Sequence, residues 1–185
     1  MAASARTSDT GSRYLLALGS NQRHHRHGAP QQVLRAAVDA LAAAGIAVLA
    51  VSAIMPSAPL GPSRRRYANA ALIVRSILTP PELLGALKAV EHQFGRRRGG
   101  RRWGARVLDL DIVLWQGGAW FSPGLTVPHV AFRERRFVLR PAARIAPHWR
   151  DPLTGLTLRQ LDARLTRVPS RRLTQPRPLP IGQHW

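Results

Sequence analysis

Apolar residues along the chain gather in short runs, separated by polar turns and by two segments with helical periodicity. Four runs rich in aliphatic and β-branched residues predict strands, and two amphipathic segments, each opened by an early proline, predict helices. In chain order the pattern predicts a strand over 14–20, a helix over 30–44, strands over 46–55 and 67–77, a helix over 79–94 and a strand over 107–115. This βαββαβ order predicts an α+β fold of the ferredoxin-like type. Such a fold is a two-layer sandwich, with a mostly antiparallel sheet that carries the helices on one face and leaves the other face free for a site.

Further elements are expected after the last of these strands. The pattern predicts a small hairpin within 120–126 and extra C-terminal helices within 133–146 and 157–165. A chain of 185 residues is long enough for one domain with its own core. We therefore expect a flexible leader over 1–12, a single domain over 13–168 and an irregular tail, rich in proline and arginine, over 169–185.

Arginine dominates the charge of the chain. Lys and Arg together number 28 against 9 for Asp and Glu, which gives a net charge of +19, and Lys88 is the only lysine. Such a charge predicts attraction to polyanions, whether nucleotides, RNA or an acidic membrane face. Guanidinium groups also bind phosphate through two parallel hydrogen bonds. Charge alone does not choose among these partners.

Two absences in the sequence narrow the class further. The chain has no cysteine, which excludes disulfides and thiolate metal sites and fits a cytoplasmic protein. No apolar run approaches the roughly 18–20 residues that a membrane span needs, and the polar leader does not resemble a signal peptide. We expect a protein with no membrane partner.

The strongest chemical feature is the pair Asp109 and Asp111 in the strand predicted over 107–115. Residues two apart in a strand project from the same face, about 7 Å apart, so the two carboxylates repel each other. A divalent cation offsets this repulsion, and oxygen ligands of this kind select Mg²⁺, which proteins hold with one or two carboxylates plus substrate phosphates. The alternative is that both aspartates pair with neighbouring arginines.

A loop rich in glycine and arginine, residues 95–106, lies directly before the acidic strand. Its arginines suit the terminal phosphates of a nucleotide and the negative charge that develops during phosphoryl transfer. The alternative is a solvated basic loop that contacts RNA without specificity. Together, the loop and the acidic pair favour nucleotide chemistry.

The run 102–114 (RWGARVLDLDIVL) resembles the signature of the 6-hydroxymethyl-7,8-dihydropterin pyrophosphokinase family. Further blocks of the chain resemble the same family in the same order. These blocks are 18–21 (LGSN), 58–62 (APLGP) with 67–70 (YANA), a helix with Glu82, Glu91 and Gly95, 125–129 (LTVPH) and 135–139 (RRFVL). The resemblance covers residues 14–150.

This resemblance implies a diphosphotransferase of folate biosynthesis, which transfers diphosphate from MgATP to the hydroxymethyl group of 6-hydroxymethyl-7,8-dihydropterin and releases AMP. It implies two Mg²⁺ ions held by Asp109 and Asp111, with Arg98 and Arg106 stabilising the transition state. The residues that match pterin contacts are Ser57, Ala58, Leu60, Tyr67, Asn69 and Phe137. The residues that match ATP contacts are Glu91, Arg98, Trp103, Arg106, Ile112, Leu125, Thr126, His129 and Arg135. The partners are therefore expected to be these two small molecules, and no specific nucleic acid is expected. The protein is expected to be a monomer.

Three departures from the family pattern bear on function. The loop 61–67 is short and basic, Met55 and Pro56 replace an aromatic–basic pair, and Lys88 stands where a neutral polar residue is common. A histidine-rich stretch at 21–28 is expected to be a solvated loop, with a transition-metal site as the alternative. Two competing functions stay open: a basic RNA-binding domain, and a relative of the family with a changed acceptor or lost activity.

Overall fold

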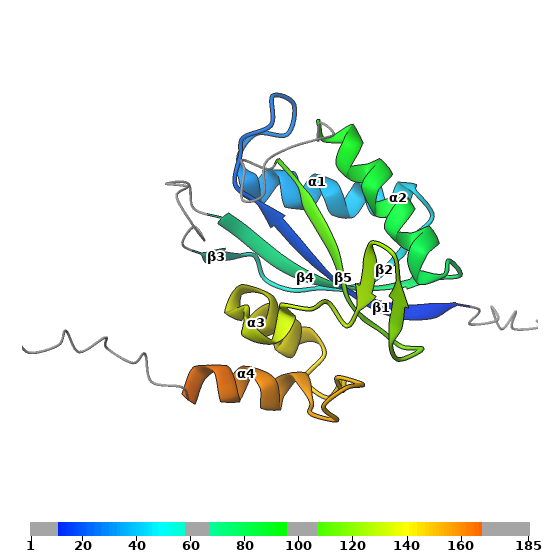
Figure 1. The fold of residues 1–185 in the computed structure, drawn as a ribbon. Helices are drawn as coiled ribbons and strands as arrows, with labels where there is room; N and C mark the ends of the chain where they lie inside the picture. Colours follow the sequence, from blue (N-terminus) through cyan, green and yellow to red (C-terminus); the bar gives the residue numbers. More distant parts are fainter. Residues whose placement is uncertain (1–10, 58–66, 96–106, 168–185) are drawn as a thin grey trace, which may run out of the picture.

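The computed structural model describes residues 11–57, 67–95 and 107–167 of the chain. Its elements match the predicted order closely (Figure 1). In chain order they are β1 (Ser12–Ser20), α1 (Pro30–Ala43), β2 (Ala47–Val51), β3 (Met55–Ser57), β4 (Tyr67–Ser76), α2 (Pro80–Gln93), β5 (Asp109–Trp115), β6 (Trp120–Ser122), β7 (Leu125–Val127), the 3₁₀ helix η1 (Phe132–Glu134), α3 (Arg136–Ile145) and α4 (Leu158–Arg167). The proposed leader and tail lie largely outside the described residues.

A five-stranded antiparallel sheet forms the centre of the molecule. Four strands follow the order β2-β4-β1-β5, and β3 pairs with β4 beyond the end of β2. The predicted antiparallel sheet is therefore confirmed. The predicted hairpin is also present, because β6 and β7 pair with each other.

The strand expected over 46–55 is in fact two short strands, β2 and β3. The chain stays attached to β4 between them through Ser52, whose backbone N–H donates to Ala71 O at 2.9 Å and whose Oγ accepts from Ala71 N at 2.9 Å. The side-chain hydroxyl takes the place of a backbone carbonyl, so the ladder is interrupted here. Apolar periodicity does not encode such a substitution.

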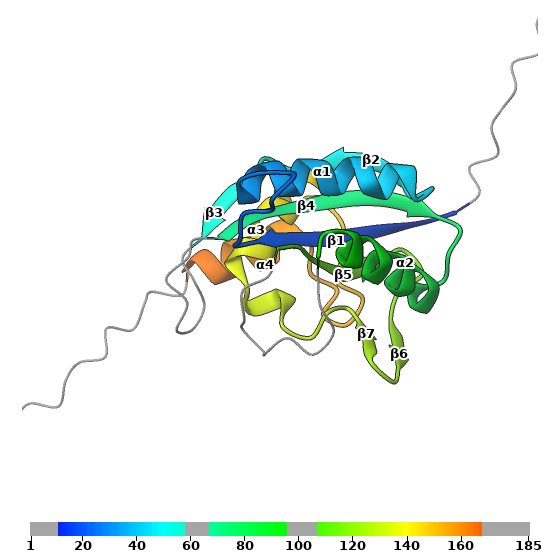
Figure 2. The ribbon, with the colours of Figure 1, turned by 90° about the horizontal axis from the view of Figure 1, so that it is seen from above.

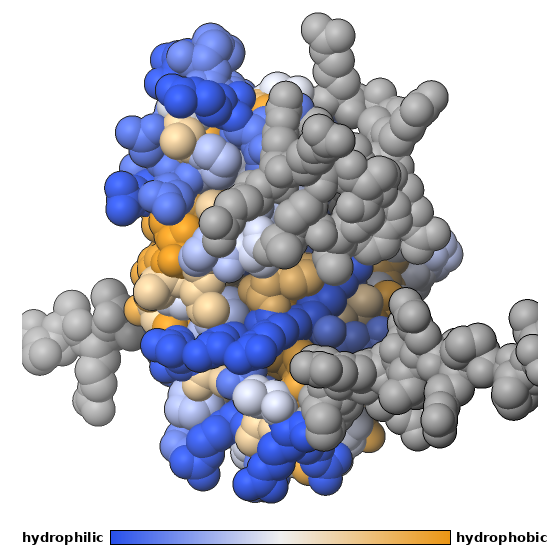
Figure 3. Space-filling model, turned by 90° about the vertical axis from the view of Figure 1, so that its left-hand side faces the viewer, coloured by the Kyte–Doolittle hydropathy of each residue, from blue (hydrophilic) through white to orange (hydrophobic). Residues whose placement is uncertain are grey.

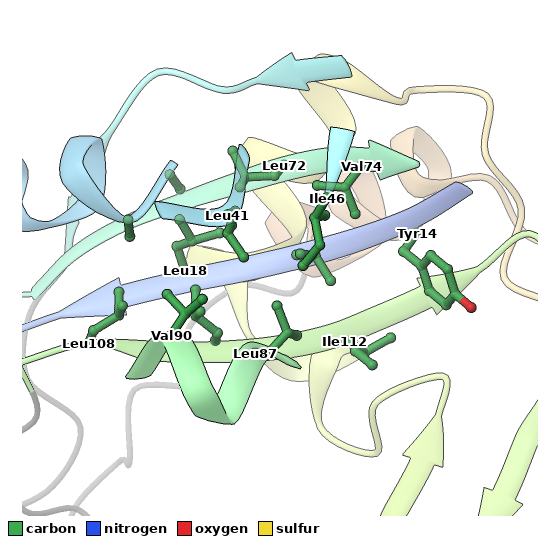
Figure 4. Packing of buried hydrophobic residues seen from close by; sticks show 14 of the residues in the cluster. Tyr14, Leu18, Leu41, Ile46, Leu72, Val74, Leu87, Val90, Leu108 and Ile112 are labelled. Atoms are coloured by element: carbon green, nitrogen blue, oxygen red, sulfur yellow. The ribbon is translucent and has the colours of Figure 1, made fainter. Parts of the chain in front are cut away.

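Helices α1 and α2 cover one face of the sheet and form the larger core (Figures 1 and 4). Each helix buries residues spaced three, four or seven apart, which is the pattern of an amphipathic helix. They are Val33, Leu34, Ala37 and Leu41 of α1, with Leu83, Leu87 and Val90 of α2. A capping box opens α2, since Glu82 Oε2 accepts a hydrogen bond from Thr79 N at 2.8 Å.

The two helices of the βαββαβ unit share one face, as predicted, but the expectation that the other face is free was wrong over part of the sheet. Helices α3 and α4 pack on the opposite face, so the molecule has three layers (Figure 1). Seen from above, α1 and α2 lie in front of the sheet and α4 lies behind it (Figure 2). A second core joins Leu15, Ala71 and Leu114 of the sheet to Leu139 of α3 and Leu158 of α4. Every residue of β4 from 68 to 74 is buried, and such a continuous apolar run is typical of a strand covered on both faces.

An ion pair with a buried carboxylate ties η1 to the loop that precedes α4. Arg133 donates from Nε and Nη2 to the two carboxylate oxygens of Asp151, each at 2.7 Å, and Thr154 Oγ1 donates to Asp151 Oδ2 at 2.6 Å. Burial by itself would raise the pKa of Asp151, but these hydrogen bonds outweigh it and hold the pKa below its usual value. The pair therefore fixes the segment between β7 and α3.

Replacing Arg133 by Met is expected to lower the free energy of unfolding by about 3–5 kcal/mol, because it leaves the buried Asp151 carboxylate without its partner. Denaturant unfolding at neutral pH measures the loss. Arg136→Met, which removes an exposed arginine nearby, is expected to change stability by no more than about 0.5 kcal/mol.

The loss in Arg133→Met should also depend on pH. A depressed pKa contributes stability above the unfolded pKa, and that stability is lost as the pH falls through the folded value. The gap between wild type and variant should therefore narrow in acid. A gap that stays constant down to pH 2 would contradict the assignment.

Candidate active site

One row of residues crosses three neighbouring strands and defines the site. The register of β1 pairs Gly19 with Asn69 on one side and with Asp109 on the other. Directly paired residues of an antiparallel sheet project from the same face. A Cβ placed on Gly19 would lie 3.8 Å from Asn69 Oδ1 and 4.0 Å from Asp109 Cβ, so both side chains flank the glycine.

The next row toward the centre of the sheet continues this floor. Ala17 pairs with Ala71 and with Asp111, and both Ala17 and Gly19 remain partly exposed. Strand spacing places the backbones of β4 and β5 about 10 Å apart across β1. Small side chains on β1 thus leave a shallow floor between the amide of β4 and the carboxylates of β5.

Asp109 and Asp111 are both partly exposed on β5, as strand periodicity predicts for two residues of one face. Burial raises the pKa of Asp111, and the charge of Asp109 raises it further. The charges of His129, Lys88 and Arg135 act in the opposite direction. The charge of Asp109 therefore acts against the ionised form of Asp111, as the sequence predicts, and three cationic groups act in its favour.

The segment between β7 and α3 carries His129 and Arg135, whose charges both act on Asp111. The His129 N–H donates to Val113 O at 3.0 Å, which joins this segment to β5. His129 Nδ1 accepts from Ala131 N at 3.2 Å, so a neutral ring carries its proton on Nε2. Burial lowers the pKa of His129, while the Asp111 carboxylate raises it and Arg135 lowers it.

On the opposite side of the floor, β3 and β4 carry the residues that match pterin contacts. The buried Asn69 donates from Nδ2 to Ser57 Oγ at 2.9 Å, which directs its Oδ1 toward Gly19. Tyr67 lies two residues before Asn69 and so shares its face of the sheet. Phe137 packs against the second core on that face, and the Arg135 guanidinium lies 5.9 Å from its ring centre.

The residues that match ATP contacts lie around β5. Leu125 is buried and Thr126 is partly exposed on β7, which contacts β5. The Ile112 side chain is buried in the first core, so only its backbone can face a ligand. Glu91 is fully buried, and its Oε1 accepts from Leu110 N at 2.8 Å. The other predicted site residues, Ala58, Leu60, Arg98, Trp103 and Arg106, lie outside the described residues.

The expectation of a solvated histidine loop at 21–28 is confirmed only in part, because Arg23, His25 and Arg26 are exposed but His24 is not. His24 is buried, its backbone pairs with Gly28, and its ring centre lies 4.7 Å from that of His27. His27 in turn stacks on Phe94 at the end of α2, at 4.8 Å. In the described parts of the chain, no group of three or more His, Cys, Asp or Glu residues could hold a metal ion. The acidic pair is thus the candidate cation site, in which substrate phosphates would complete the ligands.

Sequence reasoning missed the roles of Gly19 and Ala17 as the floor of the site. A glycine and an alanine at alternate positions of an otherwise aliphatic strand were the available signal. Figure 3 views the molecule from the side on which β3 lies, where hydrophilic residues form a band beside hydrophobic ones.

None of the described helices is long and apolar enough to cross a membrane.

Two carboxylates on β5, with the charges of His129 and Arg135 acting on Asp111, form a site that suits a divalent cation and nucleotide phosphates, as in enzymes that transfer phosphate groups. The family model of 7,8-dihydro-6-hydroxymethylpterin-pyrophosphokinase (HPPK) matches residues 15–147. The chain therefore belongs to the HPPK family.

Relatives of this family agree over most of the chain. Three proteins named 2-amino-4-hydroxy-6-hydroxymethyldihydropteridine pyrophosphokinase share 43% identity over 64% of this chain (Synechocystis), 40% over 76% (Pseudomonas aeruginosa) and 39% over 83% (Methylorubrum extorquens). The matches cover 60%, 84% and 93% of those proteins, respectively.

A crystal structure of Plasmodium falciparum HPPK-DHPS with pteroate has the same fold. It superposes with a TM-score of 0.65 at 12% identity over 84% of this chain and 42% of that one. This similarity bears on the fold alone.

Asp111→Asn is expected to stabilise the ligand-free protein at neutral pH by about 1 kcal/mol. The folded protein disfavours the charged form of Asp111, so its raised pKa lowers stability as the pH rises through the folded value. Thermal melts of wild type and variant should diverge at neutral pH and converge below the unfolded pKa. Asp39→Asn, an exposed control on α1, should not show this divergence.

Proposed function

We propose that this chain transfers diphosphate from MgATP to the hydroxymethyl group of 6-hydroxymethyl-7,8-dihydropterin and releases AMP, as a step of folate biosynthesis. The observation that carries the proposal is the row Asn69, Gly19 and Asp109, which sets an amide for the pterin and carboxylates for the metal on opposite sides of one floor. Membership of the HPPK family supports it.

The fold is best described as ferredoxin-like βαββαβ with an added C-terminal layer, which the strand order β2-β4-β1-β5 supports.

Asp109 and Asp111 would hold two Mg²⁺ ions together with the phosphates of ATP. The donor set suits this metal, since it consists of carboxylate oxygens with room for phosphate oxygens and water. The raised pKa of Asp111 marks a negative charge that the folded protein does not fully compensate. When bound, the ions neutralise charge on the phosphates.

The pterin ring would lie over Gly19 and beside Asn69. The hydrogen bond to Ser57 holds the Asn69 amide in one orientation, which prepares its oxygen for the polar edge of a flat heterocycle. Tyr67 and Phe137 would contact the faces of the ring, an arrangement that aromatic side chains favour. Ala58 and Leu60 would add contacts from the loop that follows β3.

ATP would lie along β5 and β7. The N–H of Leu110 points away from β1 toward Glu91, so strand alternation turns the backbone of Ile112 to the same outer edge, where an adenine could pair with it. Thr126 and Leu125 would flank the base and the ribose. His129 and Arg135 would contact the phosphates, and Arg98, Trp103 and Arg106 would complete the site from the loop before β5.

In the reaction, the pterin hydroxymethyl oxygen forms a bond to the β-phosphorus of ATP. The bond between that phosphorus and the oxygen bridging it to the α-phosphorus breaks, AMP leaves with the bridging oxygen, and the hydroxyl proton passes to solvent. The contribution of the chain is to align the two substrates and to stabilise charge through Arg135, Arg98 and Arg106. The acceptor stays next to the phosphates because both substrates share one floor.

We further propose that residues 13–168 act as one domain, as a monomer in the cytoplasm. Small molecules are its partners, and no specific nucleic acid is required. The net charge of +19 would then favour nucleotide attraction to the site. Size measurement in solution and salt-dependent RNA binding test these statements separately.

The first test incubates the purified protein with MgATP, with and without 6-hydroxymethyl-7,8-dihydropterin, and quantifies AMP. AMP should form only with the pterin, disappear with a chelator and fall at least about a thousandfold in Asp109→Asn, because a metal ligand is lost. Asp39→Asn should retain full activity. If ATP and the pterin bind without AMP formation, the acceptor differs; if neither binds, an RNA-binding role becomes the better explanation.

Asn69→Ala is expected to raise the KM for the pterin about tenfold to a hundredfold, since it leaves the pterin edge without a hydrogen-bond partner. The KM for ATP should stay nearly constant, because Asn69 lies across the floor from the acidic pair. Ser57→Ala, which only releases the amide from its anchor, should have a smaller effect. An equal change in both KM values would argue against this division of the site.

A further inference from the structure

At the edge of β5, a backbone N–H donates a hydrogen bond to a side chain of α2, the helix that packs on the face opposite the site. β5 forms one edge of the five-stranded sheet, so its outward backbone groups face away from β1. Leu110 lies between Asp109 and Asp111, and its N–H donates to Glu91 Oε1 at 2.8 Å. Helix α2 thereby anchors the segment of β5 that carries both carboxylates.

The second oxygen of Glu91 has a charged partner. Lys88 Nζ lies 3.2 Å from Glu91 Oε2, one turn earlier on α2. The Glu91 side chain is 0% exposed, whereas the Lys88 side chain is 45% exposed. A buried carboxylate is tolerated only with a hydrogen-bonded counter-ion, and a lysine can supply it while its head stays in water.

We propose that Glu91 is a positioning residue that holds the Asp109–Asp111 segment of β5 in place, and that Lys88 is its counter-ion. The inference rests on the proposed function in that the positioned carboxylates bind the metal. It differs from the ATP contact that the family resemblance implies for Glu91. Metal sites require ligands held within about 0.5 Å, which a hydrogen-bonded edge strand provides better than an unanchored one.

The first arm measures hydrogen exchange at the Leu110 amide in the ligand-free protein. Glu91→Met keeps the volume but removes the acceptor, so exchange should accelerate about tenfold or more. Glu91→Gln keeps an acceptor oxygen and should stay within about threefold of wild type. Glu82→Gln, a matched control at the start of the same helix, should leave this amide unchanged.

Unchanged exchange in a folded Glu91→Met protein would overturn the proposal. Should Glu91→Met fail to fold, the decision passes to Glu91→Gln, in which rapid exchange at Leu110 would also overturn it. Because this arm uses no substrate, its result is independent of whether the proposed reaction is correct.

The second arm measures the Mg²⁺ concentration that gives half-maximal AMP formation at saturating ATP. Glu91→Met should raise it about tenfold, with the KM for the pterin unchanged, and Glu91→Gln should restore it. If Glu91→Gln instead raises the KM for ATP as strongly as Glu91→Met while the Leu110 amide stays protected, Glu91 contacts ATP directly and the positioning role is wrong.

The third arm tests the counter-ion. Lys88→Met should destabilise the protein when Glu91 is present and have little effect beside Glu91→Gln, because only a charged partner needs compensation. Denaturant unfolding of the two single variants and the double variant gives the coupling. Strictly additive effects would remove Lys88 from the proposal and leave it a solvent-exposed side chain.

Discussion

The register of β1 is the constraint on which the rest of the structure depends. This strand lies between β4 and β5, and residues 14–19 have a partner on each side. A slip of one residue would turn every side chain to the opposite face of the sheet. The observed register buries Leu16 and Leu18 against α1 and α2, and it leaves Ala17 and Gly19 on the face that carries the site. The same pairing therefore builds the core and the floor.

The layer made by α3 and α4 serves the site as well as the fold. It completes a second core over β4, and its first helix carries Phe137 on the site face. The Arg133–Asp151 pair anchors the segment that also carries His129 and Arg135, whose charges act on Asp111. Stability on this face and the position of two candidate nucleotide contacts thus depend on one short stretch of chain.

At the site, the partly buried charge of Asp111 beside Asp109 lowers the stability of the ligand-free protein. In a chain of net charge +19, Asp109 and Asp111 lie side by side, and Asp111 has a raised pKa. Elsewhere, the buried Asp151 and Glu91 each have a cation within hydrogen-bonding distance. A raised carboxylate pKa such as that of Asp111 is typical of a site that keeps unfavourable charge for a ligand.

Much of this protein is determined by the sequence alone, because strand and helix periods are local. The elements β1, α1, β4, α2 and β5 follow from apolar spacing, and a period of two already puts Asp109 beside Asp111 and Tyr67 beside Asn69. The blocks that resemble the family name candidate site residues without any geometry. Tertiary structure alone decided that Gly19 separates Asn69 from Asp109 and that a third layer covers β4. It also decided that β2 and β3 are separate strands, that His24 packs near Phe94, and that Glu91 accepts a hydrogen bond from Leu110. These contacts join residues far apart in the chain, so they depend on strand register and on how the layers close, which no local pattern encodes.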